Sequence, residues 1–301
     1  MMVRRSVFLG GLAALGAAAA FPVRSAAAGN VSLAMRWYGG GVYELATPGD
    51  ADIVLVDAWI WNNTGFKQFN IPKPPELSSA ANYVAYLKAR NPKSILVLLT
   101  HDHGDHSGDY IELLKALTDA GLPVKTAGHA ELMRVGYVQK FKDAGLDPLK
   151  LVVNNGQGMN FGGAASAGGV SLRLVPAVHS NASGPPPAGF IIDLGGTRVY
   201  ASGDTDEFGD MALIGRRYKP VLGVFSAGGG PYTMNPEDAA DAARMMAVSY
   251  AVPVHYGHNP LVLGPEAGNR FKVALAKIAP DVGTTIFVPG QRAVLSLAPA
   301  T

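Results

Sequence analysis

Short runs of hydrophobic residues that end at polar ones alternate along this chain with longer segments whose apolar residues recur every three or four positions. The first pattern predicts buried strands and the second predicts helices. The clearest run is 95–99, where five aliphatic residues lead directly into Thr100 and a turn rich in histidine and aspartate. The segments predicted as strands are 31–45, 52–57, 95–100, 124–126, 151–153, 170–178, 189–194, 198–202, 221–226, 252–255, 284–288 and 293–297.

The segments with helical spacing lie between these runs. Serines at 78 and 79 can cap the first of them, and Asn235 followed by Pro236 and two acids is typical of a helix start. The predicted helices are 79–90, 107–120, 131–144, 206–218, 235–248 and 266–278. The glycine- and alanine-rich segment 161–169 predicts a hairpin or the junction of two halves. Two successive strand–helix halves favour an α/β fold with two sheets packed face to face and helices outside, an αββα sandwich formed by a single domain over 30–301.

Residues 1–29 have the composition of an export signal and are set apart from the fold. Arg4 and Arg5 precede an apolar, glycine-rich run, and small residues follow Arg24. This pattern resembles the bacterial twin-arginine signal, which implies passage through the twin-arginine export machinery, cleavage near Ala27 to Gly29, and a periplasmic location. The alternative is an uncleaved membrane anchor.

The composition of the chain after residue 29 excludes several kinds of site and partner. The chain has no cysteine, so disulfides and thiolate metal sites are excluded and any metal needs nitrogen and oxygen ligands. Three of the 25 basic residues and none of the 23 acidic residues lie in 1–29, which changes the formal charge from +2 to −1. Since there is no basic stripe either, nucleic acid is not expected as a partner.

The turn after the 95–99 strand concentrates possible metal ligands, namely His101, His103, Asp105 and His106. His101 and His103 alternate along extended chain, so both can point the same way. An ion needs three or more ligands that converge on one point, so four side chains cannot complete two sites. The remaining ligands must come from distant segments, and three candidates each follow a predicted strand: His179, Asp204 and His255.

The order of these residues resembles the metallo-β-lactamase superfamily. Its parts are His-x-His-x-Asp-His at 101–106, His179, Gly-Asp-Thr at 203–205, and His255 after a late strand. Within the superfamily the chain is most similar to the metal-dependent hydrolases that include ascorbate-6-phosphate lactonase and relatives of N-acyl phosphatidylethanolamine phospholipase D. Further matches lie at 187–190, 210–211, 232–239 and 253–256, and the likeness covers 31–297.

The resemblance implies an enzyme with two divalent metal ions. It implies that the first ion is held by His101, His103 and His179, the second by Asp105, His106 and His255, and that Asp204 bridges both. A metal-bridged hydroxide would then attack a small ester, lactone or amide, with Asp105 and Asp204 as the catalytic carboxylates. Zinc is the expected metal, and manganese or iron are alternatives. The substrate would be a small molecule.

Other functions remain open beside this one. A metal-dependent phosphodiesterase acting on a lipid or small molecule is the main alternative. A non-hydrolytic di-iron redox protein is less favoured, because such relatives carry a fused flavin domain that is not evident here.

Several positions near the predicted ligands have no assigned role or differ from the sequence pattern of those hydrolases. Those hydrolases usually carry Gly-His after their first strand, whereas this chain has glycine at 39–41. Asp57 is retained and is expected to orient a ligand. His255 and His258 compete for one ligand position, and the position after the strand favours His255. The acid for the leaving group is not assigned, although Tyr232, Tyr256 and His258 are candidates.

The aromatic segment 59–76 is expected to form a loop near the site. Its aromatic residues either flank the substrate or cover the sheet. His129 lies far from any motif and is expected to be an ordinary polar residue.

Overall fold

The computed structural model describes residues 31–298. The predicted export signal, 1–29, lies outside the described residues. Within 31–298, no helix has both the length and the apolar character that a membrane span requires.

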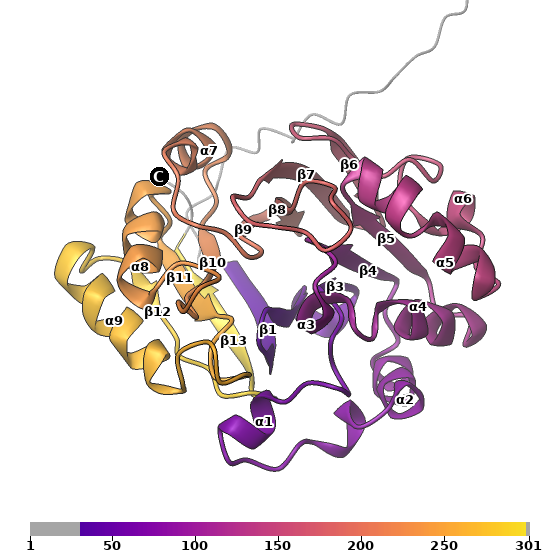
Figure 1. Cartoon of the computed structure of the whole chain (residues 1–301), viewed down its shortest axis with the longest axis horizontal. Helices are drawn as coiled ribbons and strands as arrows, with labels where there is room; N and C mark the ends of the chain where they lie inside the picture. The colour runs from indigo at the N-terminus through magenta and orange to yellow at the C-terminus, as the bar shows by residue number, and fades with distance from the viewer. Residues whose placement is uncertain (1–30, 299–301) are drawn as a thin grey trace, which may run out of the picture.

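Two sheets form the centre of the molecule (Figure 1). The first has the strand order β13-β1-β2-β3-β4-β5, and the second has the order β12-β11-β10-β9-β8-β7-β6. The strands of the first sheet are β1 Val31–Gly39, β2 Val42–Ala46, β3 Asp52–Val56, β4 Ser94–Leu99, β5 Val124–Gly128 and β13 Arg292–Leu297. Those of the second are β6 Ala164–Ala167, β7 Val170–Pro176, β8 Ala188–Leu194, β9 Thr197–Ala201, β10 Leu222–Ser226, β11 Tyr250–Val254 and β12 Gly283–Thr284.

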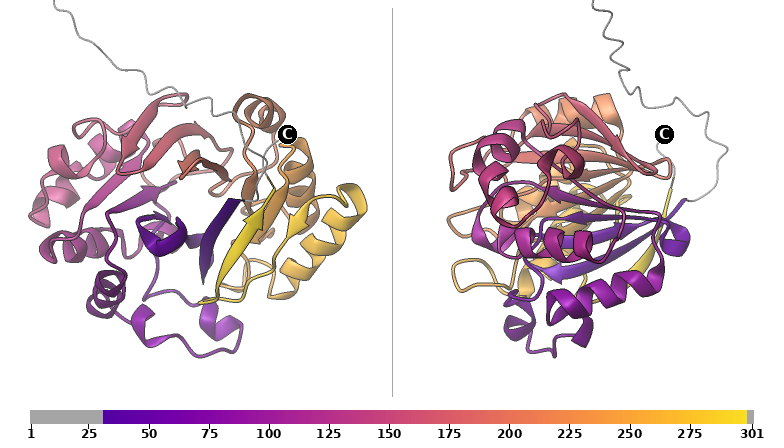
Figure 2. Two further views of the ribbon diagram at one scale, coloured as in Figure 1. Left: turned by 180° about the vertical axis from the view of Figure 1, so that it is seen from behind. Right: turned by 90° about the vertical axis from the view of Figure 1, so that its right-hand side faces the viewer.

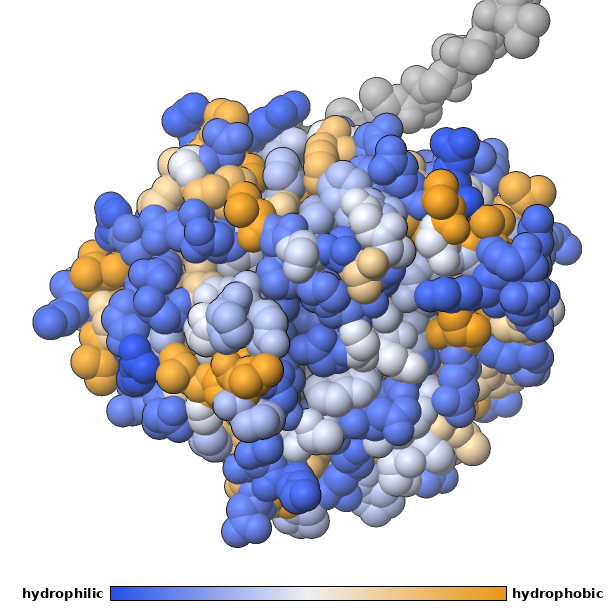
Figure 3. Space-filling model, in the orientation of Figure 1, coloured by the Kyte–Doolittle hydropathy of each residue, from blue (hydrophilic) through white to orange (hydrophobic). Residues whose placement is uncertain are grey.

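Helices cover the outer faces of both sheets (Figures 1 and 2). The helices of the first half are α1 Gly65–Gln68, α2 Ala80–Arg90, α3 Gly104–Ser107, α4 Tyr110–Asp119, α5 Val138–Asp143 and α6 Pro148–Leu151. Those of the second half are α7 Asp210–Tyr218, α8 Pro236–Met245 and α9 Glu266–Ile278. The predicted αββα sandwich is therefore confirmed. On the face shown in Figure 3, hydrophobic residues form small groups separated by polar ones.

The two-residue period of the strands explains this layering. In β4, Leu96 and Leu98 point into the layer between the sheets, whereas Ile95, Val97 and Leu99 point toward the helices. Both faces of the strand are thus buried, which is why its sequence is continuously aliphatic rather than alternating.

The predicted capping residues begin the expected helices. The side chain of Ser79 accepts a hydrogen bond from the backbone of Asn82 at the start of α2. At the start of α8, the side chain of Asn235 accepts hydrogen bonds from the backbone of Glu237 and Asp238. These local bonds satisfy amide groups that the helix itself leaves unpaired.

Some predicted elements differ in the structure. The predicted strand at 151–153 is wrong: Leu151 ends α6, which Asp147 caps, and only Val152 forms an isolated bridge, to Thr126. The helix predicted from residue 206 begins at Asp210, and the strand predicted at 284–288 pairs only at Gly283–Thr284. Asp147 as the cap and Pro148 at the first position favour a helical turn, and Val152 and Val153 lie after it.

Two antiparallel pairings near the ends of the sheets are notable, one local and one between distant parts of the chain. The segment 161–169 forms the predicted hairpin, since β6 pairs antiparallel with β7. The last strand, β13, returns to the first sheet and pairs antiparallel with β1, so that Val31 lies opposite Leu297 (Figure 2). The two halves of the sequence are therefore not strictly one sheet each.

Candidate metal centre

All seven predicted ligands lie together at the ends of strands from both sheets. His101 and His103 follow β4, and α3 carries Asp105 and His106. His179, Asp204 and His255 follow β7, β9 and β11. Carboxyl ends of strands are the usual place for a site in α/β folds, because the loops that leave them converge.

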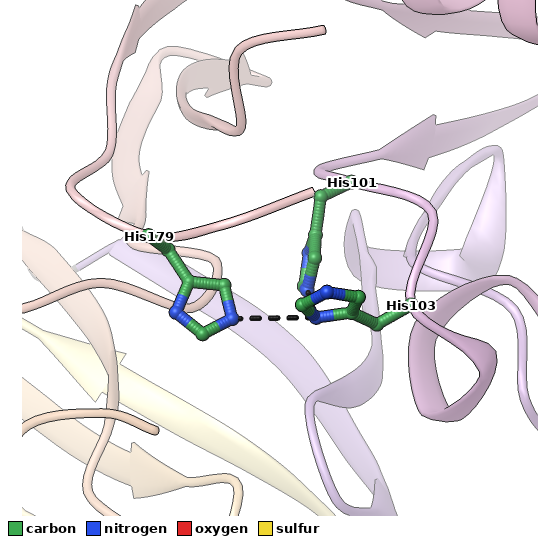
Figure 4. Close-up of side chains that lie close together, drawn as sticks. All are labelled: His101, His103 and His179. Atoms are coloured by element: carbon green, nitrogen blue, oxygen red, sulfur yellow. Dashed lines mark hydrogen bonds between the residues drawn. The ribbon is translucent and has the colours of Figure 1, made fainter. Parts of the chain in front are cut away.

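Three of the imidazoles form one group with their rings turned toward one another (Figure 4). His103 Nδ1 lies 3.0 Å from His101 Nε2 and 3.3 Å from His179 Nε2. The three rings meet edge to face, at interplanar angles of 78° to 87°. Their nitrogens therefore converge on a common point.

Asp204 connects this group to a second one. Its Oδ2 lies 2.9 Å from His255 Nε2 and 3.2 Å from His106 Nε2. The same oxygen lies 3.8 Å from His179 Nε2 and 4.0 Å from His101 Nε2. One buried carboxylate oxygen thus faces both sets of nitrogens.

Asp105 faces the second group from the partly exposed side. Its Oδ2 lies 3.5 Å from His255 Nε2 and 3.2 Å from His258 Nε2. Its side chain is 29% exposed, compared with 3% for Asp204. Solvent therefore reaches the site on the Asp105 side.

The spacing of these nitrogen and oxygen atoms fits coordination of metal ions better than hydrogen bonds between the side chains. Two donors bound to one ion at about 2.0–2.2 Å lie about 2.9–3.5 Å apart, for coordination angles from octahedral to tetrahedral. The contacts within each group match this spacing. The Nε2 atoms of His106 and His255 are buried and form no hydrogen bond, although Asp204 is close. Buried polar atoms are normally paired, so these aligned lone pairs indicate a cation site.

Asp57 orients His106 through Nδ1, the ring nitrogen that does not face Asp204. Its Oδ2 accepts a hydrogen bond from His106 Nδ1 at 2.7 Å, and its carboxylate also accepts from the backbone and hydroxyl of Thr100. The proton on Nδ1 leaves Nε2 free to bind a metal. Burial raises the pKa of Asp57, although the adjacent His106 and the hydrogen bonds from Thr100 oppose the shift. Thr100 Oγ1 in turn lies 3.0 Å from His101 Nδ1.

A glycine in the turn between β1 and β2 makes room for the His106 ring. A Cβ atom on Gly41 would lie 2.3 Å from His106 Cε1, far inside the contact distance. Any side chain at this position would displace the ring from Asp204. Gly41 is therefore required for the close approach of the backbone to the ligand.

Two acids that the sequence did not single out hold the loops around the site. Asp102 Oδ1 accepts from the backbone N–H groups of Ala182 and Ser183, in the loop that follows His179. The buried carboxylate of Asp109 accepts from consecutive backbone N–H groups at 60–62. Each acid sits beside the ligand cluster in sequence, but its partners are distant, so only the fold identifies its role.

The aromatic segment 59–76 packs partly into the core and partly beside the site. Phe66 is buried, and Phe69 packs edge-on against Trp37. Trp59 instead meets the ring of His258 at 6.0 Å, next to the ligands. The segment also contains α1, so it is not entirely a loop.

The structure brings both His255 and His258 into the site. His255 contacts Asp204 and Asp105, and His258 contacts Asp105. A tight turn lets both rings face the same carboxylate. Of the other candidate acids, Tyr256 is buried against Trp37, and Tyr232 is 42% exposed. His129 is buried beside Phe161, and its hydrogen bond is to the backbone of Glu131.

Charge within the site couples metal binding to pH. Burial opposes protonation of His255, but Asp204 and Asp105 outweigh it and raise its pKa to about 9. The pKa of His106 is likewise raised well above its ordinary value by Asp204 and Asp57, against the effect of burial. Burial would raise the pKa of Asp204, yet His106 and His255 hold it well below its usual range.

Metal binding is therefore expected to release protons at pH 7. Imidazole binds a metal only after losing its proton, so the affinity should rise with pH up to about 9, where metal-free His255 becomes neutral. In the metal-free protein, the same pairing stabilises the fold fully below an unfolded pKa of about 6.5. That stabilisation is lost as pH rises through about 9. Calorimetric titration in two buffers of different ionisation enthalpy measures the release, and zero net release would contradict the expectation.

A family model described as the Beta-lactamase superfamily domain matches residues 53–256. This range includes all seven predicted ligands. The match therefore spans more than half of the chain and contains the site.

Curated relatives and a solved structure agree with this match. A UPF0173 metal-dependent hydrolase of Nitratidesulfovibrio vulgaris (strain DP4) is 37% identical over 201 residues, covering 66% of this chain and 77% of the relative. One from Cupriavidus metallidurans is 33% identical over 270 residues, covering 83% of each. The structure of Igni18, a metallo hydrolase from Ignicoccus hospitalis, superposes with a TM-score of 0.66 at 27% identity, covering 88% of this chain and 99% of that one.

Proposed function

This chain belongs to the beta-lactamase superfamily and to its metal-dependent hydrolases, and from that premise we propose that it uses two divalent metal ions to hydrolyse a small ester, lactone or amide. Membership of this family supports the reaction type, which is metal-dependent hydrolysis. The two-ion arrangement and the substrate class are the parts that the proposal adds.

The position of Asp204 Oδ2 supports the two-ion arrangement. This single oxygen lies within 4.0 Å of four imidazole nitrogens that divide into two groups. Ions that share a bridging ligand in two-metal hydrolases are about 3.5–4 Å apart, a separation that one carboxylate can span. His101, His103 and His179 would hold one ion, and Asp105, His106 and His255 the other.

Two divalent ions held here would polarise a substrate oxygen and lower the pKa of a water between them to about 7. The chain's own residues supply orientation. Asp57 fixes the tautomer of His106, and Thr100 contacts the far nitrogen of His101. Asp105 lies on the exposed side, where its carboxylate can accept a hydrogen bond from the attacking water and hold it in line.

The donor set supports zinc as the metal and leaves room for others. Imidazoles with two carboxylates suit zinc, and manganese or iron also accept such mixed sites. In this proposal the substrate enters on the partly exposed Asp105 side, where Trp59 lies next to His258. An aromatic side chain beside a cation site suits a small molecule with an apolar part and one reactive carbonyl.

Metal analysis and a substrate panel test this function together. The purified protein is expected to hold about two equivalents of metal, the number for which a two-metal site provides. It should hydrolyse lactones, esters or amides, lose that activity on chelation, and regain it with zinc, manganese or ferrous iron. Saturation at one equivalent would refute the two-ion arrangement. Turnover of phosphodiesters alone would refute the substrate class.

A further inference from the structure

His258 is a fully buried imidazole at the edge of the ligand cluster whose role neither the family pattern nor the predicted ligand set covers. Its side chain has no exposed surface, and its Nε2 lies 3.2 Å from Asp105 Oδ2. Its ring centroid is 4.6 Å from that of His255. Asp105, His255 and His258 together offer three donor atoms close enough to share one ion.

The side-chain amide of Asn259 indicates which nitrogen of the His258 ring carries a lone pair. Asn259 Oδ1 accepts a hydrogen bond from the backbone N–H of Leu261 at 2.8 Å, which fixes the orientation of the side-chain amide. The amide Nδ2 then points at His258 Nε2, 3.1 Å away. Since an amide nitrogen can only donate, His258 Nε2 carries a lone pair in this arrangement. A ring nitrogen has only one lone pair, so the amide has to turn aside when an ion takes it.

A lone pair at this position conflicts with a simple hydrogen bond to Asp105. The carboxylate oxygen can only accept, so at 3.2 Å it faces a nitrogen with no proton to give. His255 Nε2, 3.5 Å from the same oxygen, also forms no hydrogen bond. Acceptor atoms crowded in this way are stabilised when a cation lies among them.

The fold holds the ring at this place from three sides. Trp59 packs edge-on against it, and Thr64 Oγ1 donates a hydrogen bond to the carbonyl of His258. Gly40 lies beneath the ring, where an added Cβ atom would lie 3.5 Å from it. A side chain longer than a methyl group at position 40 would therefore occupy the space that the His258 ring fills.

We propose that His258 is a further ligand of the ion on the Asp105 side, an inference that rests on the proposed two-ion function. Through Nε2 it would join Asp105, His106, His255 and Asp204, and this ion would have more protein ligands than its neighbour. The first ion, held by His101, His103 and His179, would then be the one with more open positions for substrate. The two ions should consequently differ in affinity and in their dependence on His258.

The first test measures metal affinity in His258→Ala by competition with a chromophoric chelator, with zinc as the probe. One of the two ions should bind at least about 100-fold more weakly, which is the upper end of the effect of removing an outer hydrogen-bond partner. X-ray absorption of the zinc-loaded protein should show one imidazole fewer per chain. Unchanged affinity and an unchanged imidazole number would overturn the proposal.

A second variant separates ligation from a structural role. In His258→Asp the new carboxylate can bind an ion, so the affinity of the weakened ion should recover relative to His258→Ala, most of all for manganese. If His258 only partnered Asp105, the added carboxylate would repel it, and the affinity would fall below that of the alanine variant. That fall would overturn the proposal even if His258→Ala folds poorly.

Two comparisons keep this test separate from the two-ion function. His129→Ala removes another buried histidine, beside Phe161, and should leave both affinities unchanged. If the unaltered protein binds only one ion, the two-ion function fails. Weakening of that single ion in His258→Ala would still support ligation, and unchanged binding would refute it.

Discussion

Replacing Asp204 with alanine is expected to lower kcat/KM by about 1,000-fold or more, because a correctly held metal ion supplies several kcal/mol of transition-state stabilisation. Asp204 Oδ2 is the atom that approaches both nitrogen groups, at 2.9 Å from His255 and 3.8 Å from His179. Its loss should also lower metal content from two ions toward one. Steady-state kinetics on the substrate found in the panel, with elemental analysis of the same preparation, measures both.

The matched control for this variant is Asp206→Ala, which removes an exposed aspartate two residues further along the chain. It should keep both metal content and activity. Asp204→Asn keeps the volume of the side chain but not its charge, and it should resemble the alanine variant. Activity within about tenfold of the unaltered protein in Asp204→Ala would be incompatible with a bridging carboxylate, since tenfold corresponds to only about 1.4 kcal/mol.

Asp57→Asn should weaken metal binding by about 10- to 100-fold without touching a ligand. The Asp57 carboxylate accepts from His106 Nδ1 at 2.7 Å and from Thr100. An amide can instead donate to His106 Nδ1, which places the proton on Nε2 and blocks the nitrogen that faces Asp204. Chelator competition measures the affinity, and X-ray absorption should show one imidazole fewer.

Asp57→Ala should in addition destabilise the fold by about 3–5 kcal/mol, because it leaves buried donors without a partner. Chemical denaturation measures this change. Asp143→Asn, at an exposed aspartate that accepts only from Gln139, is the matched surface control and should change neither property. If Asp57→Asn bound metal as tightly as the unaltered protein, then His106 would not depend on Asp57 for its tautomer.

The order of the elements was largely predictable, because each depends on neighbours in sequence. The aliphatic run before Thr100 is β4, and the caps at Ser79 and Asn235 begin α2 and α8. The prediction failed at 151–153, where Asp147 caps a helical turn that takes in Leu151 and ends before Val152 and Val153. The pairing of β13 with β1 was also not predictable, since periodicity does not specify a partner strand.

The seven predicted ligands share a signal that the sequence carries: each is a histidine or aspartate at, or within a turn of, a strand end. Asp102 lies inside the same cluster and Asp109 directly before α4, but their side chains accept hydrogen bonds from the backbone of distant loops. Nothing local distinguishes a carboxylate that faces a metal from one that holds a loop. That distinction depends on which backbone amides the folded chain brings within reach.

The sequence by itself determined the donor chemistry and its setting. The absence of cysteine, the cluster from His101 to His106, and the strand ends before His179, Asp204 and His255 together specified a nitrogen–oxygen metal site in a two-sheet fold. Only the tertiary structure decided the geometry: that one oxygen of Asp204 serves both groups, that Gly41 admits His106, and that His258 faces Asp105 beside His255. The physical reason is the distance along the sequence over which each kind of information acts. Periodicity, caps and donor types act over a few residues, whereas these contacts join residues that lie 25 to 153 positions apart, and folding of the whole chain sets them.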